Sequence, residues 1–210
     1  MKGMLVTKIE ELDKKRARIF LDMEFAFVLY KGELRKYGLK EGEEIGTEEY
    51  SWIVGELLPK RAKLRSMNLL KIRAYTERQL REKLQRGEYP EDSIEEAVAY
   101  VKSFGYIDDR QYAQDFIAYH MADRSGRRME QELMAKGIRR DIIQQAMENL
   151  AEEGETPDEI SVAEKILRKK NYDPETATIK EKQKLSAFLY RKGFQMDTIR
   201  SVLALDISAI

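Results

Sequence analysis

Few side chains in this sequence have the type and spacing that catalysis requires. His120 is the only histidine among 210 residues, and there is no cysteine. Because no second imidazole or thiolate can join it in a ligand set or an acid–base pair, we interpret His120 as structural or exposed. The carboxylate pair Asp108-Asp109 lies between Gly105 and a predicted helix, where helix capping is favoured over metal binding. Since a glycine-rich phosphate loop is also missing, we predict a protein that is not an enzyme and that has no metal or cofactor.

Clustered cations are the stronger chemical signal. The 38 Lys and Arg residues balance 38 Asp and Glu residues, so the formal net charge is zero. This balance hides segregation, because residues 60–86 carry ten basic and two acidic side chains, and residues 88–96 carry five acidic ones. Electrostatic potential acts within a Debye length of about 8 Å at physiological salt, so such stripes can select a charged partner locally.

The basic residues recur at three places along the chain, each time on or beside one predicted helix. A repeated basic helix creates a continuous surface suited to an acidic protein groove or a phosphate backbone. The simpler alternative is a solvated face neutralised by glutamates four residues away, which accounts for one cluster better than for three. The acidic segment 91–96 is expected to face elsewhere. The candidate binding residues are Arg73, Arg78, Arg81, Lys83, Arg86, Arg124, Arg127, Arg128, Lys136, Arg139, Arg140, Lys184, Arg191 and Lys192.

An internal repeat positions these cations. Three sets of five apolar residues share the spacings 4, 5, 5 and 4, which predicts a helix, a tight turn carrying one apolar plug and a second helix in each unit. Another helix is predicted before each pair, at residues 60–74, 109–121 and 160–171. Gly137 and Gly193 precede the plug, where a helix end favours a left-handed residue; Gly87-Glu88 replaces that pattern in the first unit, so its turn is expected to differ. The three sets are Leu80, Leu84, Tyr89, Ile94 and Val98; Met129, Leu133, Ile138, Ile143 and Met147; and Leu185, Leu189, Phe194, Ile199 and Leu203.

The first sixty residues carry β signals followed by helix signals. Strands are predicted at residues 5–9, 17–21 and 25–29, a helix at 31–37 that Gly38 ends, and a helix from Thr47, as N-cap, to Leu58, which Pro59 ends. We therefore predict a mainly all-α fold, with three tandem three-helix repeats forming an elongated curved rod. A small N-terminal antiparallel β-sheet with one or two helices precedes them. The predicted domains are residues 1–58, 59–107, 108–153 and 154–210.

Apolar stretches are short throughout the sequence. Charges interrupt the N-terminus before a run of signal-peptide length forms, and no stretch approaches the ~20 apolar residues of a membrane span. The lack of cysteine fits a reducing compartment. We expect a soluble, cytoplasmic protein that acts as a monomer and has no membrane partner.

Several of these motifs resemble those of a known family. The segment GYIDDRQYAQDF (residues 105–116) strongly resembles the inter-repeat signature of RecX, the regulator of the bacterial RecA recombinase. This segment is specific, whereas each Leu-x-x-Lys-Gly piece alone would be weak. The resemblance covers residues 60–205 and, more loosely, the N-terminal sheet. YTERQLREKL (75–84), ELMAKGI (132–138) and FLYRKGFQMDTI (188–199) are similar to the motifs of the family's first, second and third repeats.

The resemblance implies a modulator, chiefly a negative regulator, that lies in the groove of the RecA–DNA filament and limits filament growth and strand exchange. The partner is then the RecA filament, with single- or double-stranded DNA as a further candidate. Three departures from the family pattern affect the first repeat's turn, the hairpin turn and the second unit's basic surface. They are Gly87-Glu88, Met23 in place of the usual glycine, and His120-Met121 where the family often carries more arginine.

The main alternative is a helix-turn-helix nucleic-acid-binding regulator. It requires a dimer and a recognition helix with base-reading side chains near its N-terminus. The predicted third helices are acidic in the first repeat and apolar-led in the third, which argues against base reading. A metal- or nucleotide-dependent enzyme is the third hypothesis, and it lacks support from any motif.

Overall fold

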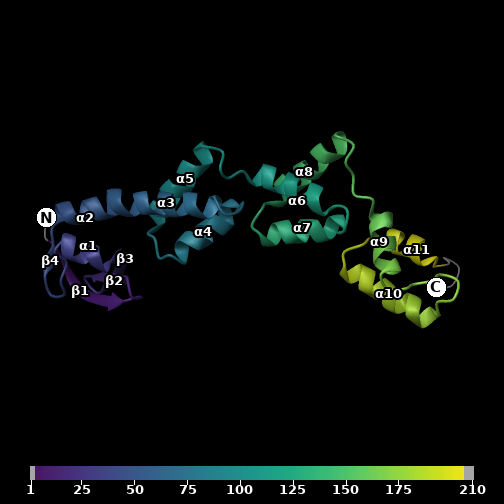
Figure 1. Ribbon diagram of the computed structural model, residues 1–210, viewed down its shortest axis with the longest axis horizontal. Helices are drawn as coiled ribbons and strands as arrows, with labels where there is room; N and C mark the ends of the chain where they lie inside the picture. Colours follow the sequence, from purple (N-terminus) through teal and green to yellow (C-terminus); the bar gives the residue numbers. More distant parts are fainter. Residues whose placement is uncertain (1–2, 206–210) are drawn as a thin grey trace. The chain divides into compact units, whose positions relative to one another are not determined.

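The computed structural model describes residues 3–205 of the chain (Figure 1). Two units are distinguished, one within Met1–Asp108 and one within Asp109–Ile210. The first holds a four-stranded sheet and one three-helix repeat, and the second holds two further repeats. The prediction of a mainly helical protein with three three-helix repeats behind a small antiparallel sheet is confirmed.

The N-terminal sheet has the strand order β3-β2-β1-β4. Strands β1 (Met4–Glu11), β2 (Arg16–Leu21) and β3 (Glu24–Tyr30) form an antiparallel meander, as predicted. The two-residue strand β4 (Glu44–Ile45) pairs with Met4 and Leu5 and was not predicted, because two residues carry no period. Asp22 and Met23 form the two-residue hairpin turn between β2 and β3, and both have positive φ, 48° and 75°. Positive φ at both positions gives a turn whose twist matches that of the flanking strands, and here the turn forms without glycine.

Two helices follow the meander, and the second continues through a proline. After α1 (Lys31–Lys36) come α2 (Thr47–Trp52), a π-helical turn η1 (Ile53–Leu57) and α3 (Leu58–Leu70), without interruption. The N-cap is Gly46 and Thr47 is already helical, so the predicted cap was one residue late.

The prediction that Pro59 ends this helix was wrong, and the π turn explains why. A proline ring clashes with the carbonyl four residues earlier, here that of Gly55. The backbone widens at this place, because the Leu58 N–H donates to the carbonyl of Ile53, five residues back. The helix therefore runs from the sheet into the first repeat, and its Ile53 and Leu58 belong to the same core as Ile19 of the sheet.

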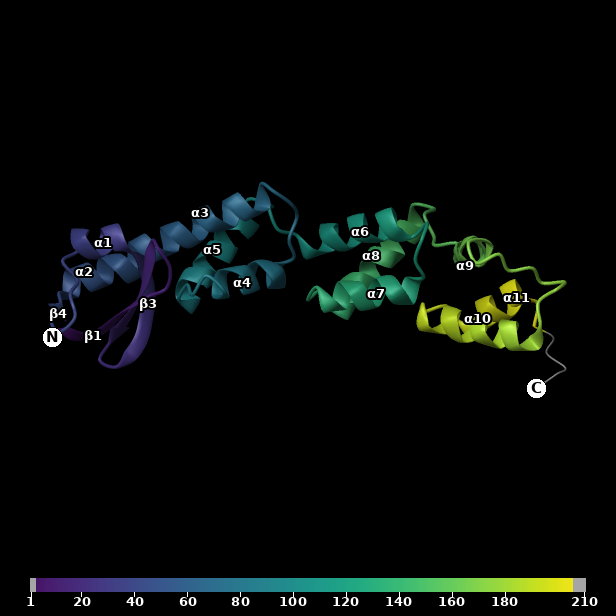
Figure 2. The ribbon, with the colours of Figure 1, turned by 60° about the horizontal axis from the view of Figure 1, so that its bottom comes forward.

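The first repeat consists of α3, α4 (Glu77–Gln85) and α5 (Glu91–Ser103), which pack on one another (Figure 2). A capping box starts α4: the Gln79 N–H donates to Thr76 Oγ1 over 3.2 Å, and the Thr76 N–H donates to Gln79 Oε1. The hydrophobic core joins Leu80 and Leu84 to Ile94 and to residues of α3.

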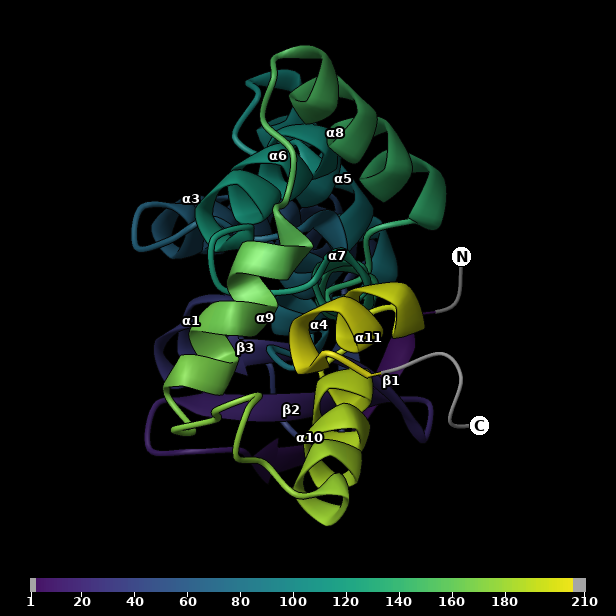
Figure 3. The same cartoon turned by 90° about the vertical axis from the view of Figure 1, so that its right-hand side faces the viewer.

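The second and third repeats use the same plan. The second contains α6 (Asp109–His120), α7 (Gly126–Ala135) and α8 (Arg140–Glu152), and the third contains α9 (Glu159–Arg168), α10 (Ile179–Arg191) and α11 (Met196–Leu203), the three helices nearest the viewer in Figure 3. Each repeat has a separate hydrophobic core. All fifteen apolar positions of the three predicted sets are buried or half-buried, so the repeat spacing is confirmed.

The turn between the middle and last helices is the same in all three repeats. The plug N–H donates to the carbonyl five residues earlier in each case: Tyr89 to Leu84, Ile138 to Leu133 and Phe194 to Leu189. Gly137 and Gly193 have φ of 93°, and Glu88 adopts the left-handed conformation at 58°. The expectation that the first turn differs was therefore wrong at the level of the backbone.

Candidate binding surface

Twelve of the fourteen candidate cations lie on or beside α4, α7 and α10, Arg139 and Arg140 lie at the start of α8, and none of the fourteen is buried. Their accessibility fits a role in binding, but accessibility does not distinguish a binding cation from a neutralised one. The acidic groups around each cation make that distinction, because a guanidinium that already holds a carboxylate gains less from a new partner.

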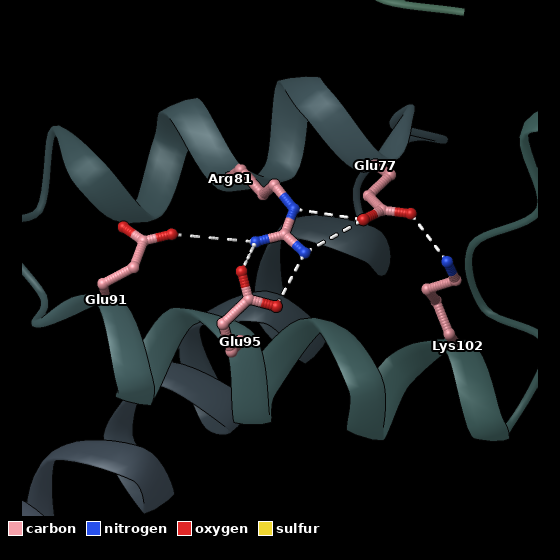
Figure 4. Close-up of polar contacts among 5 residues, drawn as sticks. All are labelled: Glu77, Arg81, Glu91, Glu95 and Lys102. Carbon is pink, nitrogen blue, oxygen red and sulfur yellow. Dashed lines mark hydrogen bonds and ion pairs between the residues drawn. The ribbon is translucent and has the colours of Figure 1, made fainter.

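Arg81 shows the strongest neutralisation, between two helices of the first repeat (Figure 4). Its guanidinium donates to Glu77 of the same helix over 3.1 Å and, through Nη2, to Glu95 of α5 over 2.9 Å. Lys102 donates to the other oxygen of Glu77 over 2.7 Å. The Lys102 ammonium and then Arg81 lower the pKa of Glu77, and Arg81 lowers the pKa of Glu95.

This cluster corrects the expectation that the acidic segment 91–96 faces elsewhere. Glu95 faces α4 directly, and Glu91 lies 3.9 Å from Arg81. The charge stripes of the sequence therefore meet inside the first repeat, where opposite charges attract across the contact between α4 and α5.

Other candidate arginines are also paired. In the first repeat Glu82 accepts from Arg78 over 3.0 Å and lies 3.8 Å from Arg86. In the second repeat Glu132 binds both Arg124 and Arg128. The remaining pairs are Arg140 with Glu130 and Arg139 with Asp141.

A smaller set of candidates keeps its charge available. This set with available charge contains Lys83, Arg127, Lys184, Arg191 and Lys192. Within residues 3–205, none of these five side chains forms an ion pair with an acidic group. Arg73 and Lys136 are outside this set, and they lie over the rings of Tyr75 and Phe116.

The structure adds two cations that sequence reasoning missed. Lys169 and Lys170 follow the end of α9, and they are exposed. They line a groove of about 570 Å³ that also includes Lys192 and Phe188 of the third repeat and Arg124 of the second. The signal in the sequence is the basic run Arg168-Lys169-Lys170, which lies outside the middle helices on which the predicted surface rests.

His120 lies half-buried at the end of α6, and its ring centroid is 4.5 Å from that of Phe116. Within the part of the chain that the structure describes, no group of three His, Cys, Asp or Glu side chains could hold a metal ion. In the same part, none of the helices is long and apolar enough to cross a membrane.

Comparisons with known proteins agree along nearly the whole chain. Residues 62–100, 108–147 and 158–203 match the first, second and third three-helix domains of RecX. The regulatory protein RecX of Caldanaerobacter subterraneus subsp. tengcongensis is 32% identical over 96% of this chain and 100% of its own length. That of Clostridioides difficile is 31% identical over 95% of this chain and 94% of its own.

Solved structures share the fold. A crystal structure of regulatory protein RecX superposes with a TM-score of 0.63 at 23% identity, covering 97% of this chain and 100% of that one. The structure of RecX from Lactobacillus salivarius gives a TM-score of 0.57 at 22% identity, over 71% and 98% of the two chains. On the matches of its three repeats and of its full-length relatives, the chain belongs to the RecX family.

Proposed function

We propose that this protein modulates the RecA recombinase, chiefly as a negative regulator, by binding in the groove of the RecA–DNA filament. The observation that carries the proposal is the match of all three repeats, in order, to the three RecX domains. The relatives are named regulatory proteins, and a regulator of this kind needs a binding surface rather than a reaction centre.

The repeats give a physical basis for binding to a filament. Each three-helix repeat closes its own core, so each can present side chains to a partner without the others. Linked modules that engage neighbouring subunits raise the effective concentration for each further contact. Modest contacts per repeat then suffice for a stable complex that opposes filament growth and strand exchange.

The cations with available charge are the proposed filament contacts. A rim cation mainly raises the association rate and selects an acidic surface. We assign this role to Lys83 in the first repeat, Arg127 in the second and Arg191 in the third, together with Lys184 and Lys192. Arg81 and Arg140, whose carboxylate partners lie on a neighbouring helix, then serve chiefly to join helices within a repeat.

The experiment is binding to preformed RecA–ssDNA filaments at a salt concentration where binding to bare ssDNA is abolished. Saturable binding, with a fall in RecA ATPase or strand exchange, is expected. Absence of binding there, with salt-sensitive binding to DNA alone, would replace this proposal by a nucleic-acid role. A footprint at one defined duplex site that survives moderate salt would instead support the helix-turn-helix alternative.

A further inference from the structure

The second and third repeats meet at the N-terminus of α7. Ser125 caps α7 by accepting from the Arg128 N–H, and its hydroxyl donates to the carbonyl of Lys192, the residue that ends α10, over 2.8 Å. Glu159, in the first turn of α9, accepts from the Gly126 N–H over 2.9 Å. Two hydrogen bonds from different helices of the third repeat thus define this joint.

Gly193 permits the close approach at the joint. A Cβ at this position would lie 2.7 Å from Ser125 Oγ and 3.2 Å from the backbone nitrogen of Arg128. Ser125 is 1% exposed and Phe194 is also buried. The second and third repeats therefore pack closely, and each provides one wall of the groove that contains Lys169, Lys170 and Lys192.

The two walls of the groove differ in charge. On the wall from the second repeat, Glu132 holds Arg124 and Arg128, and Asp123 lies 3.9 Å from Arg124. On the wall from the third repeat, Lys169, Lys170 and Lys192 have no ion pair with any acidic side chain in residues 3–205. The groove therefore carries an excess of three positive charges, all of them lysines.

An aromatic ring lies among these lysines. Phe188 of α10 is half-buried, and the ammonium groups of Lys170 and Lys192 lie 4.3 and 5.6 Å from its ring centroid. The ring holds both ammonium groups at the groove in place of a carboxylate. An incoming anion can bind these ammonium groups without breaking an ion pair. When the ammonium groups move toward the anion, the Phe188 ring becomes exposed.

We infer that this groove binds single-stranded nucleic acid, with phosphates at the three lysines and one base stacked against Phe188. Lysines that neutralise phosphates and aromatic rings that stack bases are the two elements of sequence-tolerant single-strand binding. A duplex offers no unstacked base to the ring. An acidic peptide is better matched by arginine forks, and the two arginines here already hold Glu132. The inference does not depend on the proposed function, because it requires no recombinase.

The experiment uses the full chain and a fluorescent oligothymidylate of ~20 nucleotides, a length that exceeds the site of one small single-strand module. Anisotropy titrations at several salt concentrations give both affinity and salt dependence. For Lys170→Gln/Lys192→Gln, the slope of log K against log salt is expected to fall by ~1.4, at about 0.7 for each phosphate that is no longer neutralised. Lys180→Gln/Lys182→Gln, which lies on α10 outside the groove lining, is the matched control and should bind like the wild type.

Phe188→Leu separates stacking from charge. It should weaken binding roughly fivefold or more, as expected for the removal of one base–aromatic stack, without changing the salt slope. The inference is overturned by absent binding to the oligonucleotide at low salt, by equal losses in the groove and control variants, or by unchanged binding in Phe188→Leu. Displacement of the oligonucleotide by polyglutamate at equal charge would show an acidic peptide site instead.

Discussion

At the residue scale, Glu88 departs from the glycine of the other two repeats, and its contacts in the fold explain this departure. It occupies the left-handed position that glycine holds in the other two repeats, a conformation that costs a residue with a Cβ roughly 1 kcal/mol or more. Its carboxylate accepts from Nε and Nη2 of Arg18 on β2, and Arg18 also reaches Glu10. The side chain at position 88 therefore connects the sheet to the first repeat, which glycine could not do.

This contact has a predictable pH dependence. The hydrogen bonds from Arg18 lower the pKa of Glu88 in the folded protein. The pair therefore stabilises the fold above the unfolded-state pKa of about 4.3, and this stability is lost as pH falls through the lower folded pKa. Glu88→Gln should reduce the Tm by a few degrees at neutral pH, with the gap closing below pH ~4. A gap that stays constant in acid, or an equal loss for the exposed Glu153→Gln, would contradict this role.

Gly193 gives a second prediction at this scale. Gly193→Ala meets both a positive φ and the 2.7 Å approach to Ser125, whereas Gly154→Ala meets a positive φ with no atom within 4 Å. The difference between the two variants isolates the joint, and we expect Gly193→Ala to cost about 1–3 kcal/mol more. Urea unfolding of both variants measures it, and equal losses would mean that the joint adjusts without cost.

At the element scale, local patterns predicted most of the helices. The spacing of Leu80, Leu84, Ile94 and their equivalents depends on the 3.6-residue period, which a sequence displays directly. Pro59 was misread because a π turn depends on how the helix packs on the sheet. The pairing of Arg81 with Glu95 was missed for a related reason, since it joins two helices, and a charge pattern along one helix does not specify the partner on another.

Core positions allow a direct test of the repeat pattern. Leu133 is fully buried in α7, while its neighbour Met134 is 46% exposed. Leu133→Ala should lower the free energy of unfolding by about 2–5 kcal/mol, because it removes buried methyl groups and leaves a cavity. Met134→Ala should change it by less than about 0.5 kcal/mol. Chemical denaturation of the pair measures both, and similar losses would refute the assignment of the apolar sets to the core.

At the scale of the whole molecule, net charge conceals where charge is available. The sequence predicts a binding surface of clustered cations on the repeats, but it does not specify which of those cations hold a carboxylate in the fold. Arg78, Arg128 and Arg140 looked equivalent to Arg127 in the sequence, yet each holds a glutamate in the fold. Only the three-dimensional neighbourhood separates available charge from internal charge, and it also reveals Lys169 and Lys170.

The most direct test of filament binding compares two triple charge reversals on preformed RecA–ssDNA filaments. One reverses an available cation in each repeat: Lys83→Glu, Arg127→Glu and Arg191→Glu. The control makes the same change in net charge at exposed lysines outside the candidate surface: Lys14→Glu, Lys15→Glu and Lys60→Glu.

We expect the repeat variant to bind the filament at least roughly tenfold more weakly, about 1.4 kcal/mol, with its Tm unchanged, and the control to bind like the wild type. Wild-type binding in the repeat variant would contradict a role for the repeats' cations. Equal losses in both variants would mean that total charge, and not a surface on the repeats, determines binding.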